Sequence, residues 1–158
     1  MFERYGRKLA DGIRIRSNVT IEVRGLEGQL LQRQHVRNKV VNTGLDLLME
    51  RLQASPVSGG ITHFAVGTGD TTPAATDVAL ETEVLRDTIT QFVSVAATKL
   101  TVKYFLGTGS ANGSTLSECG EFNASSSGVM YARATFTPIA KTSSKTITFS
   151  HDLNITAV

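Results

Sequence analysis

The most constraining feature of this 158-residue sequence is the alternation of apolar and polar residues over short segments separated by turn-forming clusters. Val19, Ile21 and Val23 would lie on one face of an extended segment. A glycine-containing turn at residues 25–28 follows, and residues 99–106 alternate as cleanly. Seven or eight such short strands predict a mainly β fold, an antiparallel β-sandwich. The 20 threonines and 14 glycines agree, because Thr favours strands and Gly favours turns.

A change of period predicts one α-helix near residues 43–54. Thr43 stands where a helix-capping residue belongs, and Pro56 cannot continue a helix. The helix would carry large apolar residues on one face, at Leu45, Leu48, Met49 and Leu52. The sequence leaves open whether this face meets the core or a neighbouring subunit.

Charged residues are divided unevenly along the chain. Residues 1–39 hold nine basic and four acidic residues, whereas the remainder holds seven basic and ten acidic residues. A basic first segment on an acidic body indicates electrostatic docking, onto nucleic acid or onto another copy, and a solvated terminus is the alternative. We therefore divide the chain into a basic arm, residues 1–16, and a single β-sandwich domain, residues 17–158. The arm residues expected to make assembly contacts are Arg4, Arg7, Lys8, Arg14 and Arg16.

Several protein classes lack support in the sequence. No apolar run is long enough for a membrane span, and no apolar segment follows the charged start as in a secretory signal. The single cysteine can form neither an internal disulfide nor a cysteine-based metal site. No cofactor is expected, because Gly67–Gly69 and Gly107–Gly109 lack the remaining residues of a dinucleotide motif or a P-loop. We interpret both segments as loops in which glycine permits a positive φ.

The titratable residues show no metal-binding or catalytic spacing. His35, His63 and His151 are far apart, so no metal is expected. His151 would be a partly buried imidazole on the apolar face of the last strand. Glu118 and Glu121 would point to opposite faces of one strand.

Glu118 would be semi-buried and would need a cationic partner, for which Arg86 and Arg133 are the candidates. We predict a structural ion pair between Glu118 and Arg133. Cys119 has no cationic neighbour in the sequence to activate its thiol, and no serine-centred nucleophile elbow occurs. The chain is therefore expected not to be an enzyme.

Two segments carry a resemblance to a known group of proteins. Residues 38–48 read NKVVNTGLDLL, and residues 61–77 read ITHFAVGTGDTTPAATD. They are similar to small virion proteins of tailed bacteriophages, described as tail, tail-fibre or baseplate-associated structural proteins. Later segments agree and extend the resemblance over about residues 36–155; they are residues 81–86, 116–123 and 130–141.

One of these segments, residues 116–123, also resembles collar-type fibre-attachment domains through its Leu-x-Glu-x-Gly-x-Phe-Asn pattern. Glu121 stands where that pattern commonly has an apolar residue. The resemblance therefore implies an acid at a subunit contact.

Together these observations predict a non-enzymatic structural component of a tailed-bacteriophage particle. We expect a tail, baseplate or fibre-attachment subunit that binds copies of itself and other virion proteins, is made in the host cytoplasm and is found in the virion. A capsid-decoration or head-fibre-anchoring protein is the alternative. A host-glycan-binding module ranks below both because the chain has no Trp to stack on a sugar, and nucleic-acid binding ranks lower still. Besides the arm, the expected contacts are the loops at 67–77 and 107–114, the turn Ser125–Gly128, and Asp70, Asp77 and Glu121.

Overall fold

A computed structural model describes residues 12–157 of the chain. These residues form ten strands and one helix. In chain order they are β1 (Ile13–Gly25), β2 (Leu30–Arg37), β3 (Lys39–Val40), α1 (Asn42–Glu50), β4 (His63–Gly67), β5 (Glu83–Thr88), β6 (Gln91–Ala96), β7 (Lys99–Leu106), β8 (Thr115–Phe122), β9 (Met130–Ala140) and β10 (Lys145–Ala157). Within residues 12–157, no helix has the length and apolar character needed to cross a membrane.

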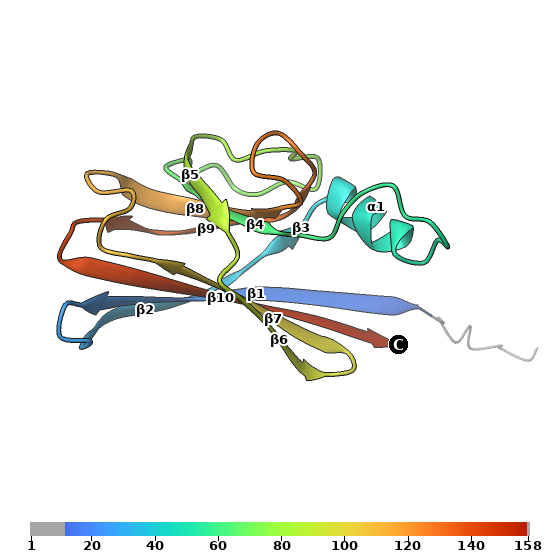
Figure 1. Cartoon of the computed structure of the whole chain (residues 1–158), viewed down its shortest axis with the longest axis horizontal. Helices are drawn as coiled ribbons and strands as arrows, with labels where there is room; N and C mark the ends of the chain where they lie inside the picture. Colours follow the sequence, from blue (N-terminus) through green and yellow to red (C-terminus); the bar gives the residue numbers. More distant parts are fainter. Residues whose placement is uncertain (1–11, 158) are drawn as a thin grey trace, which may run out of the picture.

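The strands form two five-stranded sheets that lie one over the other (Figure 1). The order in one sheet, which we name sheet A, is β2-β1-β10-β7-β6, and the order in sheet B is β3-β9-β8-β4-β5. Neighbouring strands are antiparallel throughout both sheets. The predicted antiparallel β-sandwich is therefore confirmed.

The core between the sheets is built from the alternating apolar residues of the strands. Phe64 of sheet B stacks on Tyr104 of sheet A, with ring centroids 5.0 Å apart, and its ring lies 5.1 Å from that of Phe149. Val19 and Ile21, two of the residues whose alternation predicted the first strand, are fully buried in this cluster. The alternation of apolar and polar residues along these strands thus gives each of them one buried and one solvent-facing side, as expected for a sandwich.

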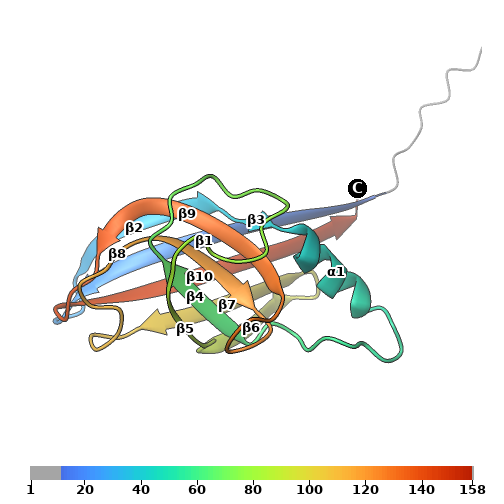
Figure 2. The same cartoon turned by 90° about the horizontal axis from the view of Figure 1, so that it is seen from above.

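The first and last strands form the longest ladder of the molecule's described part, running from the pair Ile13 and Ala157 to the pair Gly25 and Lys145. Figure 2 shows the two strands side by side along the length of the sandwich. The predicted boundary between arm and domain at residue 16 is wrong, because this ladder already includes residues 13–16.

Residues 83–96, whose side chains partly alternate between apolar and polar, are divided between two strands, β5 and β6. The chain crosses from sheet B to sheet A in the middle of this region. The N–H of Ile89 donates to the carbonyl of Thr62 at 2.9 Å, and the N–H of Thr90 donates to the carbonyl of Lys103 at 3.0 Å. The expected count of seven or eight strands is therefore too low, because a change of sheet divides a continuous alternating segment and the two-residue β3 adds another strand.

The helix is shorter than predicted and is oriented by glycine. Thr43 does not cap it; the hydroxyl of Thr43 donates to the carbonyl of Met130 at 2.8 Å. Gly44 and Leu47 face the sandwich, and a Cβ at Gly44 would collide with the backbone of Tyr131. The close approach of α1 to β9 therefore requires glycine, and it turns much of the predicted apolar face outward.

Candidate functional site

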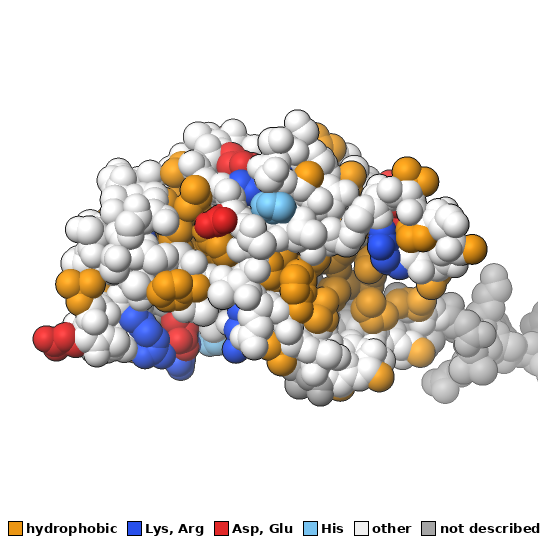
Figure 3. Space-filling view, viewed as in Figure 1, with side chains coloured by type: hydrophobic (Ala, Val, Ile, Leu, Met, Phe, Trp, Pro, Cys, Tyr) orange, Lys and Arg blue, Asp and Glu red, His pale blue; other side chains and the backbone are white. Residues whose placement is uncertain are grey.

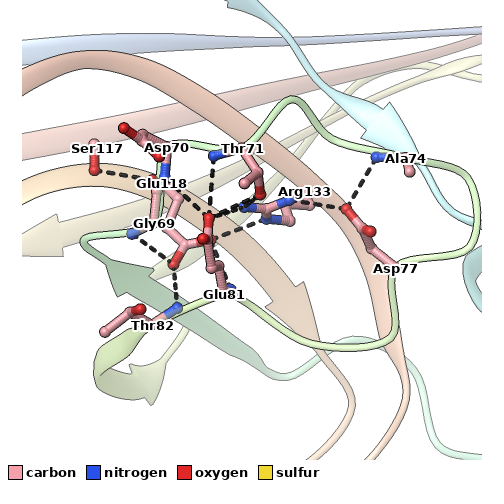
Figure 4. A network of polar contacts seen from close by, with 10 residues as sticks. All are labelled: Gly69, Asp70, Thr71, Ala74, Asp77, Glu81, Thr82, Ser117, Glu118 and Arg133. Carbon is pink, nitrogen blue, oxygen red and sulfur yellow. Dashed lines mark hydrogen bonds and ion pairs between the residues drawn. The ribbon is translucent and has the colours of Figure 1, made fainter.

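A buried carboxylate, that of Glu118, organises the outer face of sheet B. It is fully buried and accepts backbone N–H bonds from Gly69 at 3.0 Å, Glu81 at 3.0 Å and Thr82 at 2.8 Å. Nε of Arg133 donates to its Oε2 at 2.9 Å. Figure 4 shows these donors converging on Glu118 from β9 and from the segment between β4 and β5. The predicted ion pair of Glu118 with Arg133 is therefore observed.

Gly67 and Gly69 have no side chains, and the carboxylate of Glu118 occupies the space that their Cβ atoms would take. A Cβ at Gly67 would lie 2.5 Å from Oε1 of Glu118, and a Cβ at Gly69 would lie 2.6 Å from the same atom. Neither glycine has a positive φ, so the interpretation of Gly67–Gly69 as a positive-φ loop is wrong. It is also wrong for Gly107–Gly109, because the positive φ angles of this loop belong to Ala111 and Gly113. At Gly67 and Gly69 the missing side chain, and not the backbone angle, is what the fold uses.

The guanidinium of Arg133 is 3% exposed and extends from Glu118 into the segment between β4 and β5. Nη1 donates to Oδ2 of Asp77 at 2.9 Å, and Nη2 donates to the hydroxyl of Thr71 at 3.3 Å. Burial alone would raise the pKa of Asp77, but the N–H of Ala74 and the Arg133 charge outweigh burial and lower it. Charge-assisted hydrogen bonds therefore hold this long segment on the sheet.

The same segment contains Asp70 and Asp77, which the sequence analysis predicted to make assembly contacts. Asp77 is engaged within the chain, and Asp70 is exposed, with its N–H donating to Oε2 of Glu81 at 3.1 Å. Hydrogen bonds from the N–H and hydroxyl of Thr71 lower the pKa of that Glu81 carboxyl. Arg86, the other candidate partner of Glu118, instead pairs with Glu83 at 2.6 Å. The polar groups of the 67–77 loop are thus largely used inside the subunit.

Glu121 lies on the opposite face of β8 from Glu118, as predicted, and points between the two sheets. Nδ1 of His151, on β10, lies 2.6 Å from Oε1 of Glu121, and both residues are almost completely buried. The expectation of Glu121 at a subunit contact is wrong, because sheet A covers this face of β8. His151 is also more deeply buried than the partial burial predicted.

Three further polar residues surround this pair, and we name the five residues together the His151 cluster. Oγ of Ser17 lies 2.5 Å from Nε2 of His151, and Nδ2 of Asn38 lies 3.1 Å from the same nitrogen. The ring of Tyr131 lies 6.3 Å from the His151 ring, and burial followed by the Glu121 charge raises the pKa of its phenol. No local sequence pattern groups these residues, because they come from five distant segments; the sequence singled out His151 and Glu121 separately and gave no sign that they meet.

The residues between positions 12 and 157 contain no cluster of metal-ligating side chains, and their one cysteine is buried. No group of three or more His, Cys, Asp or Glu side chains there is placed to hold a metal ion. Cys119 is a buried free thiol, and burial, then the charges of Glu121 and Glu118, raise its pKa well above the ordinary value. A raised pKa keeps the thiol protonated and unreactive at neutral pH.

The other residues predicted to make assembly contacts lie in the basic arm and in two surface loops. Arg4, Arg7 and Lys8 lie outside the described residues, whereas Arg14 and Arg16 belong to β1 and are exposed. In the 107–114 loop, Asn112 accepts a hydrogen bond from the buried Lys141 ammonium at 2.9 Å. At the Ser125–Gly128 turn, the N–H of Val129 donates to the side chain of Asn123 at 2.7 Å.

Apolar side chains gather on and beside α1. Leu45 is 41% exposed, Met49 61% and Leu52 79%. Beside them is an apolar cavity of about 150 Å³, lined by residues that include Leu47, Leu48, Ile61, Tyr131 and Leu153. Figure 3 shows hydrophobic side chains around the helix and in the hollow next to it. Comparisons with protein-family models, curated proteins and solved structures found no match for the chain.

Proposed function

We propose that this chain is a structural subunit of a tailed-bacteriophage particle, located in the tail, the baseplate or a fibre-attachment site. The observation that carries the proposal is an exposed apolar surface, which we name the α1 face, formed by Leu45 and Met49 of α1 and by Leu52 just after the helix. Contiguous exposed apolar surface of this kind is typical of protein–protein contacts. The resemblance of residues 36–155 to small virion proteins supports the assignment to a particle.

The partner we propose for the α1 face is the first segment of a neighbouring copy, residues 1–11. This segment, MFERYGRKLAD, has Phe2, Tyr5 and Leu9 at helical spacing and three basic residues beside them. Asp46 and Glu50 of α1 offer opposite charge next to the apolar face. Apolar and charged parts of the two surfaces are therefore complementary.

The first described strand lies next to α1. Ile15 of β1 packs against the same apolar cluster as Leu48 of α1. Burial of one large apolar side chain contributes about 1.5–3 kcal/mol. Three such side chains contribute about 4.5–9 kcal/mol to each contact, which is comparable with the association cost of about 4–15 kcal/mol, so the charged groups must add to the stability of the contact.

Sedimentation velocity of the full chain tests this contact. Met49→Ser/Leu52→Ser and deletion of residues 1–11 should each shift the wild-type oligomer to monomer. Leu26→Ser is the matched control, since Leu26 is 70% exposed in the turn between β1 and β2 and should leave assembly unchanged. A wild-type chain that is monomeric at high concentration, or variants that assemble normally, would refute the α1 contact.

Salt separates the two components of the contact. High salt screens the basic residues of the segment but leaves apolar burial intact, so the oligomer should weaken without disappearing.

The assignment to the particle needs a separate experiment. Gold-labelled antibodies against the chain should mark the tail or baseplate in electron micrographs of particles from cells that encode it. Labels on the head would instead support the capsid-decoration alternative, and unlabelled particles would refute a virion role.

A further inference from the structure

The first residues of β1 form an open edge of sheet A. Strand β2 pairs with β1 only from Asn18 onward, whereas β10 pairs with β1 from Ile13 onward. Figure 1 shows this end of β1 continuing past the end of β2, beside the end of β10. In the described part of the chain, residues 13–16 of β1 thus have a strand on one side only, and we name their other side the β1 edge.

Hydrogen bonds on both sides of β1 define which backbone groups this edge presents. The carbonyl of Ser17 accepts the N–H of Asn38 at 3.0 Å, so the backbone groups of Ser17 point away from β10. Successive residues of a strand direct their N–H and C=O groups to alternate sides, so those of Ile13 and Ile15 point the same way. Ile155 of β10, which lies opposite Ile15, agrees, because its N–H points away from β1 toward β7. The N–H and C=O groups of Ile13 and Ile15 are therefore directed into the open edge.

The solvent-facing side of the β1 edge is basic. Arg14 and Arg16 are exposed on β1, and the exposed Arg37 at the end of β2 lies opposite Asn18, on the same face. Among residues 12–157, none of these arginines forms an ion pair. Arg16 and Arg37 both line a cavity of about 470 Å³ at this edge. Two guanidinium groups thus border a space large enough for an anionic side chain.

The opposite side of the β1 edge is apolar. Ile15 packs against the cluster of Tyr131 and Leu153, which Leu48 of α1 also contacts, and Ile13 is 74% exposed. A strand added beside β1 would place alternate side chains on these two sides. Its outward residues would meet the arginines, and its inward residues would lie next to the isoleucines.

We propose that the β1 edge binds an extended segment of another protein, which adds to sheet A as a strand beside residues 13–16. The backbone of this segment pairs with Ile13 and Ile15. Acidic residues at alternate positions face the three arginines, one of them in the cavity between Arg16 and Arg37, and the residues between them are apolar. In strand addition of this kind, main-chain hydrogen bonds supply affinity and the alternate side chains supply specificity.

Charge favours a different protein over a second copy of the chain as the partner. Two β1 edges that paired both isoleucines antiparallel would place arginine opposite arginine, and like charges in opposite positions destabilise a sheet. Residues 1–11 are a poor match because they hold three basic and two acidic residues. Among the other edge strands described, β2 and β3 carry only basic charges and β6 carries none. In β5, Glu83 already pairs with Arg86 at 2.6 Å, which leaves only Asp87.

Titration of the isotope-labelled full chain with a synthetic peptide, followed by NMR, tests the proposal. In this peptide Glu and Val alternate, and it is added up to millimolar concentration. The amide signals of Ile13 and Ile15 should shift, whereas those of β6, at the other edge of sheet A, should not. A peptide with Lys in place of Glu should not bind. Absence of shifts at Ile13 and Ile15 with the Glu peptide would overturn the proposal.

N-methylated peptides separate strand addition from simple charge attraction. In the proposed pairing the Val N–H groups face β1 and the Glu N–H groups face away from it. Methylation of the Val nitrogens should therefore abolish binding, whereas methylation of the Glu nitrogens, the matched control, should leave it unchanged. Equal binding of the two methylated peptides would refute pairing through the backbone.

Charge reversal on the protein locates the site. Arg16→Glu should weaken binding of the Glu peptide by at least about tenfold, because it replaces a charge-assisted contact with repulsion. Lys103→Glu is the matched control, since it changes the net charge equally but lies on β7, away from the β1 edge. Equal weakening by the two variants contradicts the assigned site.

Deletion of residues 1–11 distinguishes this surface from the assembly contact proposed above, because the β1 edge and the α1 face are different surfaces. The deleted chain should bind the Glu peptide as the full chain does. If the peptide binds only after the deletion, the chain's own first segment covers the edge and the proposal is wrong. Either result leaves the sedimentation test of the α1 face unaffected.

Discussion

Replacement of Arg133 by Met should destabilise the fold by about 3–5 kcal/mol. The Arg133 side chain is 3% exposed, and Met removes its charge while keeping much of its length. Glu118 is completely buried and would keep its three backbone donors but lose its counter-charge. An uncompensated charge in the interior is costly because water cannot reach it.

The individual contacts lead to the same magnitude. Arg133 donates to the carboxylates of Glu118 and Asp77, both at 2.9 Å, and to the hydroxyl of Thr71 at 3.3 Å. Each hydrogen bond to a charged group contributes about 1.5–3 kcal/mol, and the longer contact to Thr71 adds little. Apolar packing of the Met side chain in the variant offsets part of this lost stability. For a chain of this size the melting temperature should fall by about 6–20 °C.

Urea unfolding followed by circular dichroism measures the effect, and two variants control it. Arg33→Met breaks an exposed pair with Glu22, whose atoms are 2.6 Å apart, and should cost less than about 1 kcal/mol. Adding Glu118→Gln to Arg133→Met should restore part of the stability, because it removes the unpaired charge. The reasoning fails if Arg133→Met costs no more than Arg33→Met, or if the second substitution destabilises the double variant further.

Three further predictions follow from the same network. Gly69→Ala should lower the free energy of unfolding by about 1–3 kcal/mol, because the new Cβ would lie 2.6 Å from a side-chain oxygen of Glu118. Gly59→Ala is the control; no atom lies within 4 Å of its Cβ, so this variant should be neutral or slightly more stable in thermal unfolding. The pKa of Asp77 is lowered in the folded state, so this carboxylate contributes stability that is fully present above its ordinary pKa of 3.8 and is lost as pH falls through the lowered pKa. Urea midpoints should therefore drop as pH falls below about 5, and less steeply in Asp77→Asn. Cys119 should react with a maleimide only after unfolding, and rapid reaction in the native state would contradict its burial.

The sequence was informative wherever one residue's environment follows from its neighbours in the chain. The alternation at Val19 and Ile21 predicted strands with a buried face, and both side chains are fully buried. The spacing of Glu118 and Glu121 placed them on opposite faces of β8, which the structure confirms. Such inferences succeed because the period of a strand is a local property of the backbone.

The sequence failed where two distant segments compete for the same space. Gly44 was unremarkable as a helix residue, yet its contact with the backbone of Tyr131 decides which side of α1 faces the sandwich. Gly67 and Gly69 resembled flexible turn residues, but their missing side chains make room for Glu118. No local pattern encodes a close approach between segments about fifty or more positions apart.

The sequence by itself thus determined a mainly β chain, its alternating buried faces, one short helix and the pairing of Glu118 with Arg133. Only the tertiary structure decided that three backbone N–H groups also donate to Glu118, and which acid and hydroxyl His151 meets. The physical reason is that the alternation of side chains along a strand is a local property of the backbone, whereas strand pairing, burial and charge pairing depend on which segments the fold brings together. The Ser17, Glu121 and His151 contacts exist only because β1, β8 and β10 come together between those sheets.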